Sequence, residues 1–446
     1  MRIKSNPQHS IFDYFGEHKL GQELKAISKI LDEHPEIYEL AAPDLIRVNI
    51  KGTGRKGLTV ESVVRCAVLK QHRQLTYEEL AFHLEDSESF RTFARLDGKC
   101  PRKSVLQKTI TLIKGTTWEQ INRLLLKIAL IKKIEDGNKI RVDSTVTESD
   151  IHYPSDNSLL WDAIRIIIRL LQTAKEFSST ISYCDRKRKA KRLSFLIRTV
   201  KEKKRRKCYR ELIKIAKEEL SYLQKAKEIL AQNNIVEPLY EAWRAQVAHY
   251  EILITKIIAQ AERRIFNGES ISSIEKVVSL FEDHTDIIAK SNREVKFGHK
   301  LNLATGKTGL ILDAIVEKGN PADSKRLIPM LERQIDIYGE APDKASADGG
   351  YASKQNLLDA KQLGVKDMAF HKKRGLIIEN MVRSKWVYKQ MRNFRAGIES
   401  DISCLKRAYG LARCIWKGWE KFKSYVWSAI VSYNLSLLSK LLPQPG

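Results

Sequence analysis

The stretch EVKFGHKLNLATGKTGLILDAIV, residues 294–316, decides the fold prediction. Apolar and polar side chains alternate from Glu294 to Leu303, which indicates a β-strand with one buried face. The glycine-containing segment Thr305–Gly309 separates this run from a second apolar run, Leu310–Val316. Two such runs joined by a short turn predict a β-hairpin.

Shorter elements flank this hairpin on both sides. Residues 139–145, KIRVDST, are typical of a short strand that precedes it. The apolar spacing after the hairpin predicts alternating helices and strands. The expected helices are 324–338, 355–362, 392–409 and 421–442, and the expected strands are 344–348 and 367–370. The order strand, hairpin, helix, strand, helix, strand, helix is that of an α/β, RNase H-like fold.

A long helical segment separates the first strand from the hairpin. Residues 158–266 contain almost no Gly and a single proline, Pro238. Their Leu, Ile and Ala residues recur at helical spacing, which predicts antiparallel helices packed as a coiled-coil-like hairpin or bundle. The fold class is therefore an α/β RNase H-like core with a long helical insertion after its first strand.

The N-terminal region is predicted to be an all-α domain. Thr76 and Glu79 form a capping-box pattern, and the last of three short helices carries Lys103 and Lys108. Three short helices joined by tight turns suit a helix-turn-helix DNA-binding motif, and they suit a plain helical bundle equally well. The expected domains are a helical DNA-binding domain (1–115), the start of the core (116–154), the helical insertion (155–275), the rest of the core (276–420), and a C-terminal helix and tail (421–446).

The charge balance points to a polyanionic partner. The 446 residues include 79 Lys and Arg against 54 Asp and Glu, which gives a formal net charge of +25. Nucleic acid fits this excess better than a membrane, because no signal-peptide core and no run of 18 apolar residues occur. The six cysteines are scattered without a C-x₂-C pair, so zinc and disulfides lack support and a reducing cytoplasm is expected.

One block of the helical insertion is strongly basic. Residues 186–210 hold 14 Lys and Arg and one acid, Glu202. A charge block is usually a solvated surface, but this density favours a patch that contacts DNA phosphates. The predicted DNA-binding residues of this block are Arg186, Lys187, Arg188, Arg205 and Arg206.

Three acidic residues stand where a sheet would bring them together. Asp143 closes the first strand, in RVDST, and Asp348 closes a later strand, in SADGGY. Glu399 lies on a long helix, in RAGIESDISCLKRAYGL. Carboxylates at one sheet edge suit a hard cation such as Mg²⁺, and two ions about 4 Å apart support phosphoryl transfer. An ordinary turn suits each aspartate as well, but their settings at predicted strand ends favour the metal role.

Basic residues share the helix face of the last acid. Arg395, Glu399 and Lys406 have the spacing R-x₃-E-x₆-K, which places them on one face. The nearby Asp401 competes with Glu399 but lies off that face. His299 and Lys300 of the predicted hairpin are candidates for contact with the reacting phosphate, and an ordinary sheet-surface role fits them as well.

At these motifs the chain resembles the bacterial insertion-sequence DDE transposases, in particular branches with an InsH-like helical N-terminal region such as the ISNCY group. The resemblance covers most of the chain and rests on the motifs VDSTVTESDIHYPSDNSLLWD, HTDIIAKSNREVKFGHKLNL, SADGGYAS and RAGIESDISCLKRAYGL. It implies a catalytic and metal-binding triad of Asp143, Asp348 and Glu399, with two Mg²⁺ per site that Mn²⁺ can replace. Arg395 and Lys406 are then the signature cations, while Arg392 stands where relatives often have Tyr.

The resemblance implies an enzyme that binds terminal inverted repeats, cleaves DNA and joins the freed 3′-OH to target DNA. Its expected partners are double-stranded DNA and a second copy of itself, in the bacterial cytoplasm at the nucleoid. One alternative is a metal-dependent nuclease without strand transfer. Another is a non-catalytic DNA-binding or architectural protein derived from a transposase, which predicts a disrupted acidic trio.

Overall fold

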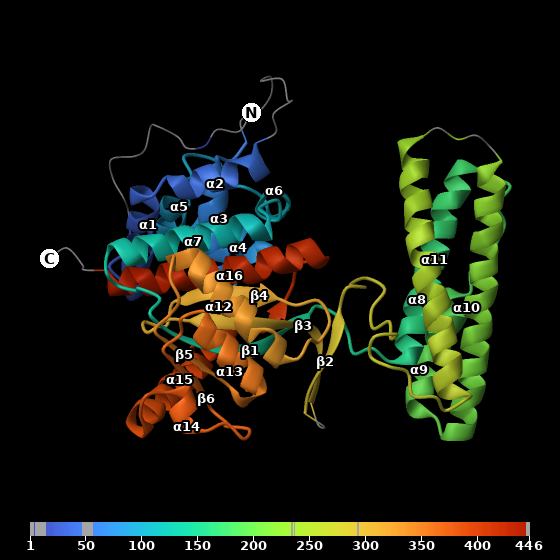
Figure 1. Ribbon diagram of the computed structural model, residues 1–446. Coiled ribbons are helices and arrows are strands. Elements are labelled where there is room, and N and C mark those ends of the chain that lie inside the picture. Colours follow the sequence, from blue (N-terminus) through green and yellow to red (C-terminus); the bar gives the residue numbers. More distant parts are fainter. Residues whose placement is uncertain are drawn as a thin grey trace. The chain divides into compact units, whose positions relative to one another are not determined.

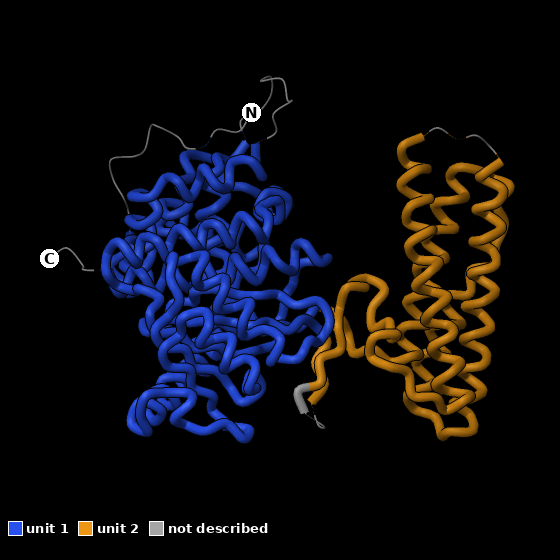
Figure 2. The backbone as a smooth tube through the Cα atoms, in the orientation of Figure 1, with its two compact units in different colours: residues 1–149, 298–446 blue, residues 150–297 orange. Residues whose placement is uncertain are grey.

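The computed structural model describes residues 4, 15–46, 57–232, 235, 237–291 and 294–442. The chain divides into two compact units (Figure 2). Residues 1–149 and 298–446 form one, here called the sheet unit, and residues 150–297 form the other, here called the helical unit. Two chain segments therefore build the sheet unit, and the helical unit is inserted between them.

Strand β1 (Lys139–Ser149) is the centre of the sheet. It pairs antiparallel with β3 (Glu294–Thr305) and parallel with β5 (Lys344–Ala347). Beyond these, β4 (Ile311–Val316) is antiparallel to β3, and β6 (Asp367–Phe370) is parallel to β5. A two-residue strand, β7 (Arg413–Cys414), pairs parallel with the last residues of β1. Asp143, within β1, and Asp348, directly after β5, are thus carried by adjacent strands.

Helices cover both faces of this sheet (Figure 1). Helix α15 (Lys385–Ala408) packs on β1, β5 and β6, and it begins where the Ser384 hydroxyl accepts a hydrogen bond from the Val387 N–H. Helix α12 (Leu327–Tyr338) packs on β4 and on α13 (Lys354–Gln362). The short 3₁₀ turns η1 (Asp323–Lys325) and η2 (Gly349–Tyr351) contact each other beside the strand ends.

The N-terminal helices and the last helix share one core with the sheet. Helix α16 packs on α7, α3 and α1, and the buried residues of all these elements form one continuous hydrophobic cluster. Helix α4 opens with the capping box expected from Thr76 and Glu79. The bounds of these helices and of the other helices of the sheet unit are α1 (Lys19–Glu33), α2 (Glu36–Leu45), α3 (Val60–His72), α4 (Tyr77–Asp86), α5 (Glu88–Phe93), α6 (Lys103–Ile110), α7 (Gly115–Ile131), α14 (Ile378–Met381) and α16 (Trp419–Leu441).

The helical unit is an antiparallel assembly of long helices. It contains α8 (Asp156–Phe177), α9 (Lys187–Thr199), α10 (Glu202–Ala231) and α11 (Pro238–Ile265), followed by strand β2 (Asp286–Ser291). Pro238 is the first residue of α11, a position where its missing N–H costs no helical hydrogen bond. A separate cluster of Leu, Ile and aromatic residues forms its core, including Trp243, whose indole N–H donates to the Leu170 carbonyl.

The order of elements agrees with the prediction from sequence, including the strand Asp367–Phe370 and the β3–β4 hairpin. Several boundaries differ. Strand β1 continues to Ser149 instead of ending near residue 145, because its second half pairs with β3 and β7, so Asp143 lies within the strand and does not close it. The expected N-terminal domain, 1–115, is not a separate compact unit, because its apolar faces pack against α16. The inserted unit runs from 150 to 297, longer than the expected 155–275, because β2 and the segment before it belong to it.

Candidate active site

Asp143 and Asp348 lie side by side where the pairing of two parallel strands ends. The last register pair between β1 and β5 joins Val142 to Ala347; Asp143 is the next residue of β1, and Asp348 is the first residue after β5. The Ser144 N–H donates to Asp143 Oδ1 at 2.7 Å, which fixes that carboxylate. Strand pairing therefore brings together two carboxylates that are 205 positions apart in the chain (143 and 348).

Arg395 of α15 joins these aspartates to Glu399. Its Nη2 lies 2.7 Å from Asp143 Oδ2 and 3.7 Å from Asp348 Oδ1, and its Nη1 lies 2.9 Å from Glu399 Oε1. Because Asp143 Oδ2 and Asp348 Oδ1 both contact Nη2, these two oxygens cannot lie further apart than the sum of their distances to that nitrogen. Three carboxylates from distant parts of the sequence therefore converge on a single guanidinium group.

The three carboxylates differ in their access to solvent. The side chain of Asp143 is 14% exposed, that of Asp348 is 40% exposed and that of Glu399 is 65% exposed. Burial raises the pKa of Asp143 above its ordinary value, and the neighbouring Arg395 cation only partly offsets this effect. The site thus has one fixed, buried carboxylate and two that face outward.

The donor chemistry of this cluster fits a divalent cation. All three groups are oxygen donors, which Mg²⁺ prefers, and their convergence on Arg395 shows that they stabilise positive charge at this point. Among the residues that the structure describes, no three acidic, His or Cys side chains stand close enough together to hold a metal ion directly. The Arg395 guanidinium occupies the point on which the three carboxylates converge.

The structure separates Glu399 from its neighbour Asp401. Asp401 Oδ2 accepts a hydrogen bond from Arg141 Nη2 at 2.6 Å, and the same arginine donates to the Phe394 carbonyl. This pair is mostly buried between β1 and α15, and Gly397 leaves room for Arg141 because a Cβ there would collide with its Nη1. Asp401 is therefore a structural partner of Arg141, a role that the sequence does not reveal.

The glycines after Asp348 are required by packing. A Cβ on Gly349 would lie 2.7 Å from Lys372 Cβ, and a Cβ on Gly350 would lie 2.7 Å from Asp323 Oδ2. Asp323 is a fourth acid beside the site, and sequence analysis missed it because nothing in the local sequence predicts that η1 folds against β1. Packing against Lys372 and Asp323 therefore accounts for these glycines.

Two predicted phosphate contacts of β3 are buried. The ring of His299 is fully buried against Trp419 and Phe422, and its Nδ1 lies 3.1 Å from the Glu317 carbonyl oxygen. Lys300 is 8% exposed, and its Nζ lies 2.5 Å from Asp323 Oδ1. The expectation that these residues contact DNA is corrected here, because both side chains are held inside the sheet unit.

The remaining cations of α15 follow one side of the helix. Arg392 is exposed, with its guanidinium carbon 5.9 Å from the centre of the Tyr388 ring. Lys406 is half-buried, three turns beyond Arg395. On α6, Lys103 and Lys108 are both exposed, and Lys103 Nζ lies 3.0 Å from Glu78 Oε2.

The basic block of the helical unit divides into paired and unpaired cations. Arg205 and Arg206 donate to main-chain carbonyls at the ends of α9 and α11, and Arg186 and Lys187 pair with Glu218 and Asp185. A second set is exposed and, in the described part of the chain, has no acidic partner. We call it the open cationic face: Arg188, Lys191, Arg192, Arg198, Lys201, Lys203, Lys204 and Lys207. Of the five cations predicted to bind DNA, only Arg188 belongs to it.

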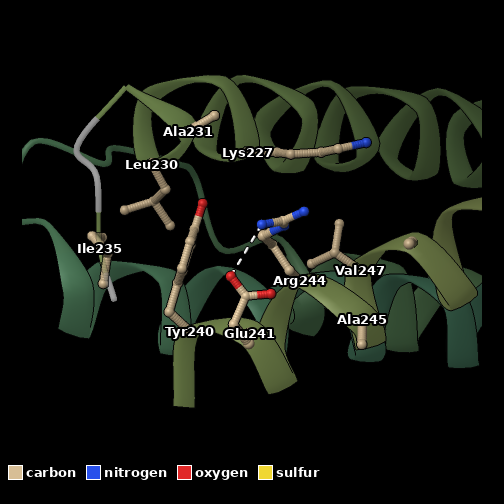
Figure 3. Close-up of a pocket in the computed structure, with 10 residues that line it drawn as sticks. Lys227, Leu230, Ala231, Ile235, Tyr240, Glu241, Arg244, Ala245 and Val247 are labelled. Carbon is tan, nitrogen blue, oxygen red and sulfur yellow. Dashed lines mark hydrogen bonds and ion pairs between the residues drawn. The ribbon is translucent and has the colours of Figure 1, made fainter. Parts of the chain in front are cut away.

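A surface pocket of about 990 Å³ lies between α10 and α11 of the helical unit (Figure 3). Leu230, Tyr240 and Val247 line it together with Arg244, which pairs with Glu241 at 3.1 Å. Its only acid is thus neutralised by an arginine. The pocket offers no set of ligands for a metal ion and is not the candidate active site.

Two protein families match the chain. The family described as Transposase DDE domain matches residues 279–435, and the family described as Transposase domain (DUF772) matches residues 13–112. Together they cover more than half of the chain. No curated protein and no solved structure matches it significantly.

Both matches fall on the sheet unit's elements or on the segment leading into them, and both identify the class of protein as a transposase. The chain belongs to the insertion-sequence DDE transposases. Its DDE domain implies an RNase H-like core, a metal-dependent nuclease or transposase activity, and DNA as a partner. The resemblance predicted from the sequence motifs is confirmed. Within the described residues, no helix has the length and apolar character needed to span a membrane.

Proposed function

We propose that this transposase binds the terminal inverted repeats of an insertion sequence, cleaves the adjoining phosphodiester bonds and transfers the freed 3′-OH to target DNA. The observation that carries the proposal is the convergence of Asp143, Asp348 and Glu399 on Arg395. A non-catalytic DNA-binding protein does not need three acids from three separate elements at one point, whereas a metal-dependent enzyme does.

The residues that would hold Mg²⁺ are Asp143, Asp348 and Glu399, and Mn²⁺ suits the same oxygen donors. When bound, a pair of such ions activates the attacking oxygen and stabilises the leaving oxygen of the phosphodiester. Asp143 supplies the rigid end of the site because it is buried and hydrogen-bonded to the Ser144 N–H. Glu399, the most exposed of the three, is free to adjust its side chain when substrate binds.

Arg395 has a second role in this proposal. Its guanidinium carries the fork of N–H donors that matches a phosphate group. Once it leaves the carboxylates, it remains within a side chain's reach of them and is placed to bind the phosphate being cleaved. Arg392 and Lys406 extend the same helix side in both directions, so α15 would follow the DNA backbone.

DNA outside the active site would contact the open cationic face and α6. The open cationic face carries charges that no acid of the described chain neutralises. Binding of DNA at such charges is favoured because it releases counterions from the DNA. On α6, the exposed side chains of Lys103, Ser104, Gln107 and Lys108 form a polar surface suited to a DNA groove. Because two transposon ends must be held together, we propose a homodimer on DNA, working at the nucleoid.

The test is cleavage of a DNA duplex that carries the ends of the element, in Mg²⁺. We expect the parent to cut and Asp348→Ala to be inactive, because the latter lacks one oxygen ligand. Asp336→Ala is the matched control, since Asp336 is an exposed carboxylate of the same unit, on α12. Equal cutting by the parent and Asp348→Ala would overturn the mechanism.

The same assay separates strand transfer from simple cleavage. A transposase yields products in which the element's 3′ end is covalently joined to a second, labelled DNA. Cutting without any joined product would favour the metal-dependent nuclease.

A further inference from the structure

Lys300 and Asp323 form a charged pair beside the active-site strands. Lys300 projects from β3, and its Nζ lies 2.5 Å from Asp323 Oδ1 and donates to the Pro321 carbonyl at 2.7 Å. The lysine side chain is 10% exposed and the aspartate side chain 23% exposed. A buried ammonium group is costly unless it is paired and hydrogen-bonded, so each partner keeps the other in place.

The carboxylate of Asp323 touches both segments that carry the catalytic aspartates. The Ser144 hydroxyl donates to Asp323 Oδ2 at 3.4 Å, and Ser144 is the residue whose N–H holds Asp143. The same oxygen lies so close to Gly350 that a Cβ there would approach it to 2.7 Å. Gly350 follows Asp348 by two residues. One carboxylate oxygen therefore packs against β1 next to Asp143 and against the segment that follows β5.

The turn that carries Asp323 is anchored at its far end as well. Arg326, directly after η1, makes two hydrogen bonds to Glu317, at 2.5 and 2.9 Å. Glu317 also accepts from Asn302 Nδ2, and Asn302 Oδ1 accepts from the Tyr351 hydroxyl at 2.6 Å. The turn η1 is thus tied to β3 and to η2. Asp323 has little freedom to move.

The pKa of Tyr351 depends on the charges of this region. Burial raises its pKa well above the ordinary value, and the negative charges of Asp323, Asp143 and Asp348 add to the effect. These three carboxylates therefore share one electrostatic neighbourhood. Without Lys300, Asp323 would add a third negative charge next to two that already repel each other.

We propose that Asp323, held and neutralised by Lys300, is a positioning residue that fixes Asp143 within β1 and Asp348 just after β5 in the geometry needed for metal binding. The inference deepens the proposed function and rests on it. Asp323 acts through Ser144 and Gly350 and is not itself a metal ligand. Mg²⁺ demands near-ideal octahedral geometry, so a small displacement of either aspartate is enough to weaken binding.

The experiment is calorimetric titration of the full-length chain with Mn²⁺ in the absence of DNA. We expect Asp323→Ala to raise the Mn²⁺ Kd by roughly tenfold or more, the usual effect of removing a group that orients metal ligands. Lys300→Met raises it as well, because the unpaired Asp323 no longer holds its place. Ser144→Ala, which leaves the ion pair intact, gives a smaller rise.

Competing explanations give different patterns. If Asp323 is itself a ligand, Lys300→Met tightens Mn²⁺ binding while Asp323→Ala weakens it. If the pair serves stability alone, both variants lower the Tm and bind Mn²⁺ as the parent does. Either pattern overturns the proposal. If the alanine variant does not fold, Asp323→Asn replaces it. This variant keeps the size and accepts from Ser144 but loses the ion pair with Lys300, so the Mn²⁺ Kd is expected to rise less than in Asp323→Ala, and an unchanged Kd would overturn the proposal.

A matched control is Lys307→Met, which breaks a solvent-exposed ion pair with Asp136 (2.6 Å) in the same unit. It is expected to leave the Mn²⁺ Kd unchanged. Asp348→Ala distinguishes a failure of the proposed function from a failure of the positioning role of Asp323. If the parent and Asp348→Ala bind Mn²⁺ equally, the proposed function fails. If Asp348→Ala loses binding and Asp323→Ala does not, only the positioning role fails.

Discussion

Replacing Arg395 by alanine removes the cation that Asp143, Asp348 and Glu399 share. The contact with Asp143 joins two mostly buried side chains at 2.7 Å, and hydrogen bonds between charged groups contribute about 1.5–3 kcal/mol. The contacts with Asp348 and Glu399 are solvent-exposed, so each adds about 1 kcal/mol at most. The metal-free variant should therefore lose roughly 2–3 kcal/mol of stability.

For a unit of this size, such a loss lowers the Tm by roughly 5 °C. The measurement is scanning calorimetry in EDTA and again in Ca²⁺, which binds carboxylates. We expect Ca²⁺ to raise the Tm of Arg395→Ala more than that of the parent, because no guanidinium group has to be displaced. An equal Ca²⁺ effect on both proteins would refute the idea that Arg395 and a metal ion compete for the same carboxylates.

Arg333→Ala is the matched control for this comparison. Arg333 makes two hydrogen bonds to the buried Asp313 of β4, at 2.5 and 2.7 Å. Its loss should lower the Tm by a similar amount. Because Asp313 is not among the proposed metal ligands, Ca²⁺ should stabilise this variant no more than it stabilises the parent.

Three further predictions concern other parts of the molecule. Alanine at three cations of the open cationic face should weaken binding to duplex DNA, measured by fluorescence anisotropy. The slope of log Kobs against log salt should fall in magnitude by roughly 3. An unchanged slope would show that DNA does not contact this surface. Burial raises the pKa of Glu219 in α10 to about 7, so its folded-state pKa exceeds the unfolded one and the stability of the helical unit falls as pH rises from about 4.5 to 7. Glu219→Gln should abolish that fall and stabilise the unit by up to about 3 kcal/mol at pH 8, as seen in thermal unfolding at pH 5 and 8, whereas equal pH dependence in both proteins would contradict it. Glu399→Gln should abolish cleavage with little change in Tm, while Asp401→Asn should lower the Tm and retain the metal site; the reverse pattern would exchange their roles.

Much of the fold follows from local sequence patterns. The alternation in residues 294–316 predicted the hairpin, and the strand Asp367–Phe370 was predicted with its observed bounds. The RNase H-like order and the helical insertion also depend on periodicity and on the lack of Gly in residues 158–266. These features are local, so a single sequence contains them.

Features that depend on packing between distant segments were not predictable. The sequence shows Arg395 and Glu399 on one helix face, but it does not show that Arg395 lies between three carboxylates. Likewise, His299 sits in an alternating strand, and only the packing of α16 buries its ring against Trp419. Asp323 lies in a short turn whose contact with Ser144 bridges 179 positions of the chain.

The central claim is that residues 143, 348 and 399 form one site for divalent metal ions. The most direct measurement replaces Mg²⁺ by Fe²⁺, adds ascorbate and peroxide, and maps where the hydroxyl radicals formed at the metal cut the polypeptide. The account predicts cuts near all three positions, which disappear together in Asp348→Ala and on adding excess Mg²⁺. Cuts confined to one of the three segments, or cuts that persist in Asp348→Ala, would contradict it.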